Sequence, residues 1–210
     1  DIWDFTSLSG IIYLNSTFLA VGGSGTILTS SDGTSWTSRT SGNSNYLKGI
    51  TYGNSTFLVV GHTGTILTSS DGTSWTSRTS GTSQHLKGVI YGNSTFLAVG
   101  HSGTILTSSN GTSWTLRTSG TSNDLRAVIY GNSTFLAVGI SGTILTSPDG
   151  TSWTSRTSGT SKNLYGVTYG NSTFLAVGEL GTILTSSDGT SWTSRTSGTS
   201  SDLYSVTYIK

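Results

Sequence analysis

Residues 47–79 read LKGITYGNSTFLVVGHTGTILTSSDGTSWTSRT, and near-copies of this segment follow one another along the chain at a step of 39 residues. The tetrapeptide Asn-Ser-Thr-Phe marks this period and begins at Asn15, Asn54, Asn93, Asn132 and Asn171. Five tryptophans keep the same step: Trp36, Trp75, Trp114, Trp153 and Trp192. A fixed period of this size is typical of repeat architectures. We therefore expect one domain over residues 1–210, with repeats that start near residues 8, 47, 86, 125 and 164.

Each repeat is predicted to form four short β-strands separated by three tight turns. In the second copy, β-branched and aromatic residues are concentrated in residues 47–52, 57–60, 65–68 and 74–79. Turn residues separate these runs, and at Gly53-Asn54 we expect a two-residue hairpin. Residues 57–60 are all apolar, as in a strand that is covered on both faces. No apolar period of 3.6 residues predicts a helix.

Four antiparallel strands per repeat are typical of the blade of a β-propeller. We expect an all-β fold, namely a five-bladed β-propeller of four-stranded antiparallel blades. A single-file β-solenoid is the alternative, although its coils would not need three hairpin turns per repeat. The third position of the first strand is small in every copy, which suits strands that crowd around a central axis: Gly10, Gly49, Gly88, Ala127, Gly166 and Ser205.

A turn of the form Ser-x-Asp-Gly-x-x-Trp recurs in every repeat, for example at Ser69–Trp75, and Asn110 replaces the aspartate in the third copy. This turn resembles the Asp-box (BNR) repeat of sialidase-like and photosystem II assembly factor-like propellers, with one residue fewer before the glycine. The resemblance covers nearly the whole chain. It implies a structural motif, in which the carboxylate accepts hydrogen bonds from turn amides and the tryptophan packs between strands.

The first-strand pattern occurs six times, whereas the other three strands occur five times each. The surplus copy lies at residues 203–208, and residues 1–7 form a non-repeat N-terminal arm. One interpretation is ring closure, in which residues 203–208 complete the first blade and residues 1–13 are a loose arm. The other is that the surplus strand pairs with a neighbouring molecule and builds oligomers or filaments. The candidate assembly residues are Trp3, Phe5, Ile11, Ile12, Leu203, Val206 and Tyr208.

The copies differ from one another mainly at three places that share one rim of an up-and-down blade. These are the turn after the second strand, the end of each linker between blades, and the second residue of each first strand. We expect this rim to carry any binding site, because sequence variation in loops on a rigid scaffold often carries function. The candidate residues are Tyr46, His62, His85, His101, Asp124, Arg126, Asn163, Tyr165, Glu179, Asp202 and Tyr204, with Lys48 and Lys87 beside them.

Three further patterns resemble functional sites, but we do not predict a metal, catalytic or anion-binding site from any of them. His62, His85 and His101 share the rim, yet their spacing matches no metal-ligand motif, so no metal site is predicted. Asp124 and Asp202 come from separated linkers and make a poor acid–base pair. An arginine follows each tryptophan by three residues, and we expect these arginines to protect the exposed outer edge of each blade: Arg39, Arg78, Arg117, Arg156 and Arg195.

Composition narrows the function class. Charged residues make up 9% and the net charge is +1, so neither nucleic acid nor membrane insertion is expected. There is no cysteine, and no cofactor motif or catalytic constellation emerges from five near-identical surfaces. We expect a secreted, extracellular, non-enzymatic structural or interaction propeller, with self-assembly as a hypothesis. The alternatives are a multivalent lectin that binds glycans and a designed symmetric propeller without a biological function.

Overall fold

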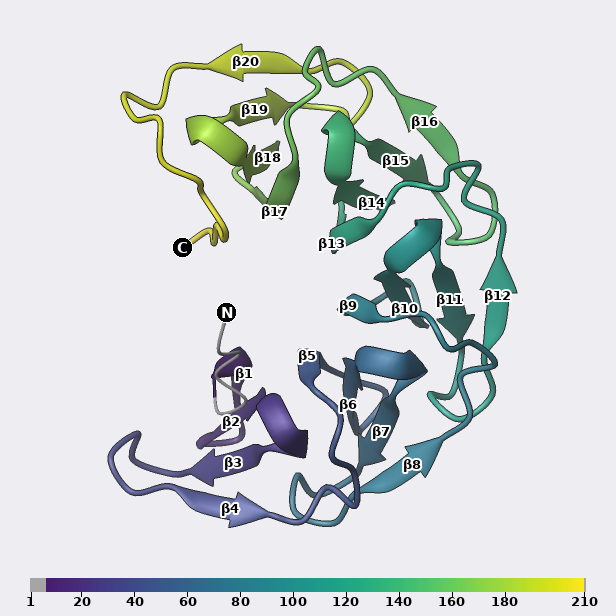
Figure 1. The fold of residues 1–210 in the computed structure, drawn as a ribbon, viewed down its shortest axis with the longest axis vertical. Coiled ribbons are helices and arrows are strands. Elements are labelled where there is room, and N and C mark those ends of the chain that lie inside the picture. The colour runs from purple at the N-terminus through teal and green to yellow at the C-terminus, as the bar shows by residue number, and fades with distance from the viewer. Residues whose placement is uncertain (1–6, 210) are drawn as a thin grey trace.

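The computed structural model describes residues 7–209, and these residues form five four-stranded antiparallel sheets in chain order (Figure 1). This confirms the all-β propeller of four-stranded blades. In the described residues, no helix is long and apolar enough to cross a membrane. The strands are β1 (Leu8–Leu14), β2 (Thr17–Gly22), β3 (Ile27–Ser30) and β4 (Thr37–Arg39); β5 (Leu47–Gly53), β6 (Thr56–Gly61), β7 (Ile66–Ser69) and β8 (Thr76–Arg78); β9 (Leu86–Gly92), β10 (Thr95–Gly100), β11 (Ile105–Ser108) and β12 (Thr115–Arg117); β13 (Leu125–Gly131), β14 (Thr134–Gly139), β15 (Ile144–Ser147) and β16 (Thr154–Arg156); β17 (Leu164–Gly170), β18 (Thr173–Gly178), β19 (Ile183–Ser186) and β20 (Thr193–Arg195).

The first hairpin turn lies one residue later than the sequence predicted. Gly53 still pairs with Thr56, so the two turn residues are Asn54 and Ser55, with φ of 46° and 55°. Two positive φ values are what a hairpin turn of type I′ requires, and asparagine tolerates them well. Gly53 is needed for a different reason, because a Cβ atom there would lie 2.0 Å from the ring of Tyr91 in the next blade.

The innermost strands crowd around the axis as predicted. A Cβ atom on Gly49 would lie 3.2 Å from Val60 and 3.3 Å from the backbone oxygen of Lys87 on the neighbouring inner strand. Pairing of the first two strands also shifts register by one residue between Leu47 and Gly49. Small residues at this third position therefore let adjacent blades approach closely.

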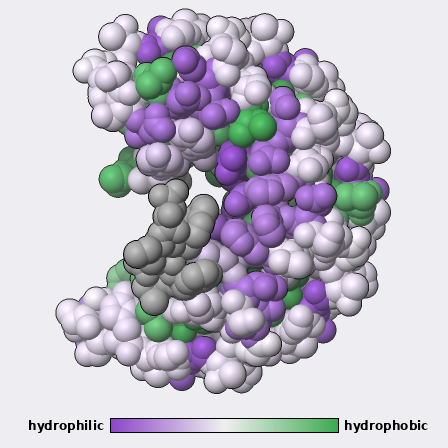
Figure 2. Space-filling model, viewed as in Figure 1, coloured by the Kyte–Doolittle hydropathy of each residue, from purple (hydrophilic) through white to green (hydrophobic). Residues whose placement is uncertain are grey.

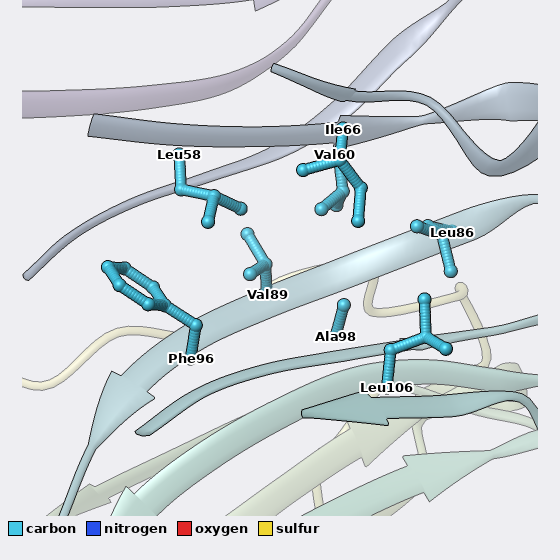
Figure 3. Close-up of a cluster of buried hydrophobic side chains, with 8 residues drawn as sticks. All are labelled: Leu58, Val60, Ile66, Leu86, Val89, Phe96, Ala98 and Leu106. Carbon is cyan, nitrogen blue, oxygen red and sulfur yellow. The ribbon is translucent and has the colours of Figure 1, made fainter. Parts of the chain in front are cut away.

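Four apolar cores, one between each pair of consecutive blades, hold the propeller together. One face of a blade packs against the opposite face of the next blade, so the second strand of each inner blade is covered on both sides. Residues 57–60 show this, with exposed fractions between 0% and 8%. Figure 3 shows the core between the second and third blades, which is formed by Leu58, Val60, Ile66, Leu86, Val89, Phe96, Ala98 and Leu106.

The Ser-x-Asp-Gly turn is held by its own side chains. The Asp71 carboxylate accepts hydrogen bonds from the backbone N–H groups of Thr73 and Ser74, both at 2.8 Å, and from the Ser69 hydroxyl at 2.9 Å. These bonds, led by the one from Ser74, hold the pKa of Asp71 well below its ordinary value. Asn110 accepts the equivalent backbone bonds at 2.9 and 3.0 Å, so the motif needs an acceptor oxygen rather than a charge.

The repeated arginines form hydrogen bonds between the outer strand and its neighbour, a role beyond the edge protection that the sequence analysis predicted. The Nε of Arg78 donates a hydrogen bond of 2.8 Å to the hydroxyl of Thr68 on the adjacent strand. The other four arginines make the same bond at the same distance. Because the outer strands have three residues each, this side-chain bond adds a cross-strand link to a short backbone ladder.

The ring of blades is open between the first blade and the fifth (Figure 1). Residues 8–14 form β1 and pair with β2 along their length, so within the described part of the arm they are not loose. The surplus segment 203–208 lies on the fifth blade, where the Leu203 N–H donates to the Gly178 carbonyl at 3.0 Å. The interpretation in which this segment completes the first blade is therefore wrong for this structure, since β1 already holds that position.

Candidate functional site

The diversified residues gather on the face that carries five single turns of 3-10 helix, which we call the axial face. These turns are η1 (Gly23–Gly25), η2 (His62–Gly64), η3 (His101–Gly103), η4 (Ile140–Gly142) and η5 (Glu179–Gly181). The ends of the inter-blade linkers and the starts of the first strands adjoin them. Figure 2 shows strongly hydrophilic side chains along the inner edge of the arc.

Four of the linker residues have a structural role that the sequence analysis missed. In each case the side chain accepts a hydrogen bond from the backbone N–H at the second position of the preceding 3-10 turn, where φ is positive. The acceptors differ in charge but all carry a lone pair, and the bonds measure 2.9–3.0 Å. They are His85 to Thr63, Asp124 to Ser102, Asn163 to Ser141 and Asp202 to Leu180. A comparison of these four positions as acceptors, rather than as charges, would have revealed the pattern.

The three histidines form a continuous row of rings with Tyr46. Ring centroids are 5.3 Å apart for Tyr46 and His62, 4.2 Å for His62 and His85, and 4.9 Å for His85 and His101. Burial, and then the nearby Lys87 charge, lower the pKa of His62 to about 4, so its imidazole is neutral at pH 7. In residues 7–209, no three histidine, aspartate or glutamate side chains are placed to hold a metal ion. The first two ring pairs of the row are stacked, and His85 meets His101 edge-on.

Three cations occupy equivalent positions on consecutive innermost strands, where the axis opens onto the axial face. Lys48, Lys87 and Arg126 are the second residues of β5, β9 and β13. They line a cavity of about 630 Å³ together with Tyr165 and Tyr204, which continue the series. Ser9 and Asn163 complete the lining of this axial cavity.

The cations of the axial cavity are only partly neutralised. Burial, and then the positive charges of Lys48 and Arg126, lower the pKa of Lys87 to about 8. Arg126 lies 3.6 Å from the Asp124 carboxylate, yet its buried Nε has no hydrogen-bond partner among the described residues. An anion in the axial cavity would favour the charged form of Lys87.

The far side of the axial cavity carries a pair of tyrosine rings. Tyr165 and Tyr204 stack with centroids 5.1 Å apart. The Tyr204 hydroxyl lies 3.4 Å from the Asp202 carboxylate, and this negative charge raises the pKa of Tyr204. The axial cavity thus combines a cationic wall with an aromatic wall.

The remaining candidate residues lie in other surroundings. Glu179 is on the axial face and accepts a hydrogen bond of 3.1 Å from the Asn163 N–H. Ile11 is 62% exposed on β1, whereas Ile12 packs into the first inter-blade core. Trp3 and Phe5 lie outside the described residues. Leu203, Val206 and Tyr208 belong to the segment on the fifth blade, which does not line the axial cavity except through Tyr204.

Four of the repeated tryptophans are not presented as platforms for a sugar. Trp75, Trp114, Trp153 and Trp192 pack against the inter-blade cores. The indole N–H groups of the last three donate to the glycine carbonyl of their own turn at 3.1–3.2 Å. Trp36, on the first blade, is 38% exposed.

Comparison with solved structures supports the fold. YCF48 bound to a D1 peptide has a TM-score of 0.71 and 18% identity, over 90% of this chain and 66% of that one. YCF48 from Cyanidioschyzon merolae gives 0.71 and 17%, over 95% and 75%. The computationally designed Ika8 protein gives 0.79 and 12%, over 97% and 66%. The chain thus spans about two thirds to three quarters of these neighbours, and the expected likeness to photosystem II assembly factor-like propellers is confirmed.

Comparison with sequences places the chain in a family. No curated protein sequence matches it. The model of the DUF6242 beta propeller domain matches residues 84–203, which is more than half of the chain and includes the third, fourth and fifth blades. The chain therefore belongs to the DUF6242 beta propeller domain family.

Proposed function

We propose that this chain is a non-enzymatic interaction module, and that its axial cavity binds an acidic segment of a partner protein. The observation that carries this proposal is the row of three cations, Lys48, Lys87 and Arg126, at one mouth of the propeller. Lys48 lies 3.8 Å from the centroid of the Tyr46 ring and Arg126 lies 3.6 Å from the Asp124 carboxylate, and neither contact holds a turn of the repeat. The equivalent positions of the fifth blade and of the surplus segment carry Tyr165 and Tyr204 instead.

Charge and hydrogen bonding both favour a carboxylate-rich ligand. A carboxylate can accept two parallel hydrogen bonds from a guanidinium group, and the guanidinium of Arg126 belongs to a residue that lines the cavity. Lys87 has a pKa of about 8, so part of its population is uncharged just above neutral pH, and a bound anion would restore its charge. The Tyr165–Tyr204 stack offers an apolar surface for the backbone or an aliphatic side chain of the same ligand.

The fold class is compatible with this role. The neighbour YCF48 has been solved bound to a D1 peptide, so a propeller of this shape can hold a peptide. At 18% identity the likeness extends to the fold alone, and the proposed ligand class comes from the residues of the axial cavity.

The absence of enzymatic activity is part of the proposal. Asp124 and Asp202 lie beside the lining residues Arg126 and Tyr204, and each accepts a backbone hydrogen bond that holds a turn. A group fixed in this way is poorly suited to move protons in a reaction. Secretion also stays a proposal, based on composition. Self-assembly depends on a different surface, the open ends of the arc.

Binding of a fluorescein-labelled hexaglutamate peptide, measured by anisotropy at pH 7 and low salt, tests the proposal, with hexalysine as the peptide control. We expect Arg126→Gln and Lys87→Gln each to weaken hexaglutamate binding by about tenfold, the effect of losing roughly 1.4 kcal/mol. Lys162→Gln is the matched control, since it removes one charge outside the cavity lining. Equal binding by wild type, both cavity variants and the control would refute the proposed site.

A further inference from the structure

The segment 203–208 occupies the position that the innermost strand of a further blade would take. In the second blade, a Cβ on Gly53 would meet the ring of Tyr91 on the next inner strand at 2.0 Å. At the equivalent place in the fifth blade, a Cβ on Gly170 would meet the ring of Tyr208 at 2.1 Å. The contact is the same, so the fifth blade holds residues 203–208 as the second, third and fourth blades hold the first strand of their neighbour.

Among residues 7–209, no outer strands accompany this innermost segment. Residues 202–209 pair with no strand among residues 7–209. As a result, the fifth blade's apolar face is incompletely covered: Leu175 and Ile183 are partly exposed, whereas the equivalent Leu58 and Ile66 are fully buried. An unpaired strand edge over an incomplete apolar core is a template for strand addition.

The complementary half of this interface lies at the other end of the arc. The first blade exposes the face that in later blades packs against the preceding blade. On this face, Leu28 is partly exposed where Leu67 is fully buried. The innermost strand β1 is also covered less than β5, since Leu8 is 53% exposed where its counterpart Leu47 is 0% exposed. The four internal cores show what covers this face in every other repeat, namely the preceding blade.

The glycine of the Ser-x-Asp-Gly turn shows that the first blade lacks a contact that the later blades make with the blade before them. In the second blade, a Cβ on Gly72 would lie 3.2 Å from Leu19 of the preceding blade. The third, fourth and fifth blades show the same contact at 3.1–3.3 Å. Gly33 of the first blade meets only Phe18 of its own blade, at 3.6 Å.

We propose that residues 203–208 displace β1 of a second copy of the chain and pair with its strand β2, so that the first blade of that copy becomes a composite of two chains. The inner strand then comes from one copy, and β2, β3 and β4 come from the other. The register follows that of β1, in which Tyr13 pairs with Phe18, so Tyr208 takes the place of Tyr13. The interface that forms repeats the chemistry of the four internal cores.

The contact is heterologous, because the donor surface and the acceptor surface lie at opposite ends of the arc. Each added copy therefore leaves one free donor and one free acceptor, and assembly continues head to tail unless the geometry closes a ring. We expect the weight-average mass to rise with protein concentration in sedimentation velocity.

Two variants separate the donor from the acceptor. Deletion of residues 203–210 removes the donor strand, and Leu28→Glu places a charge on the acceptor face. Each should weaken self-association by about tenfold or more, since a buried unpaired charge or a lost strand costs well over 1.4 kcal/mol. Leu116→Glu is the matched control, because Leu116 is 64% exposed on β12, away from both ends of the arc.

A mixture of the two variants gives the decisive result. The deletion variant keeps an intact acceptor and Leu28→Glu keeps an intact donor, so an equimolar mixture should form a 1:1 dimer and nothing longer. Far-UV circular dichroism checks that both variants stay folded. The proposal is overturned if wild type is monomeric at every concentration, if the deletion variant associates as well as wild type, or if the mixture yields no dimer.

Discussion

The open arc makes a quantitative prediction about two leucines that occupy the same position in successive repeats. Leu67 is fully buried in the core between the first and second blades, where it packs with Leu19, Val21 and Ile27. Leu28 is its counterpart in the first blade and is partly exposed, because no blade precedes it. The same substitution should therefore have different costs at the two positions.

Truncation of a buried leucine to alanine costs about 2–5 kcal/mol, because transfer energy is lost and a cavity remains. A leucine with one open side loses fewer contacts and leaves no enclosed cavity, so about 1 kcal/mol is expected at Leu28. With a urea slope near 3 kcal/mol/M, a loss of about 3 kcal/mol at Leu67 lowers the unfolding midpoint by about 1 M. Leu28→Ala should lower it by about a third of that.

The assay is urea unfolding followed by far-UV circular dichroism, at a concentration where sedimentation shows single chains. Leu106→Ala and Leu145→Ala are matched controls, since both residues are buried at the same position of the third and fourth blades, and they should behave as Leu67→Ala does. If Leu28→Ala cost as much as these three, the first blade's face would be covered in the monomer. The open arc, and the interface argued from it, would then be wrong.

Three further predictions concern backbone packing, acid stability and charge in the axial cavity. Gly131→Ala should lower the midpoint of thermal unfolding clearly, because the new Cβ would lie 2.4 Å from the ring of Tyr169; an unchanged midpoint would show that the blades are not so closely packed. Asp71→Asn should reduce the loss of stability in acid, and Asn110→Asp should increase it. The hydrogen-bonded carboxylate has a lowered pKa in the folded state, so its contribution to stability is present above the ordinary value of 3.8 and is lost as pH falls below that value. Urea midpoints at pH 7 and pH 3 measure this, and equal acid sensitivity of both variants and wild type would contradict it. Lys87 has a pKa of about 8 in the folded state against 10.5 in the unfolded state, so the free protein should gain stability from this residue as pH rises between these values. The affinity for hexaglutamate should fall over the same pH range. Lys87→Met should lose both trends, and their persistence in that variant would assign them to another group.

The candidate site shows where reasoning from sequence was sufficient and where it was not. Positions that vary between copies predicted a shared rim, and the structure brings these positions onto the axial face. Variation alone did not separate turn acceptors such as Asp202 from cavity-lining cations such as Lys87. The difference lies in the contacts of each side chain, since the acceptors bond to a turn of the preceding blade that no local sequence pattern records.

The sequence by itself determined the repeat, the four strands of each blade and their order in every sheet. Each of these features is local: alternation of side chains, turn residues and a fixed spacing act within about forty residues. Only the tertiary structure decided that Gly53 is a packing glycine and Asn54-Ser55 the turn, since this follows from a tyrosine in another blade. It also decided that residues 203–208 lie on the fifth blade and leave the ring open. Near-identical repeats offer chemically equivalent neighbours to that segment, so the choice depends on which blade face lies within reach and not on residue type.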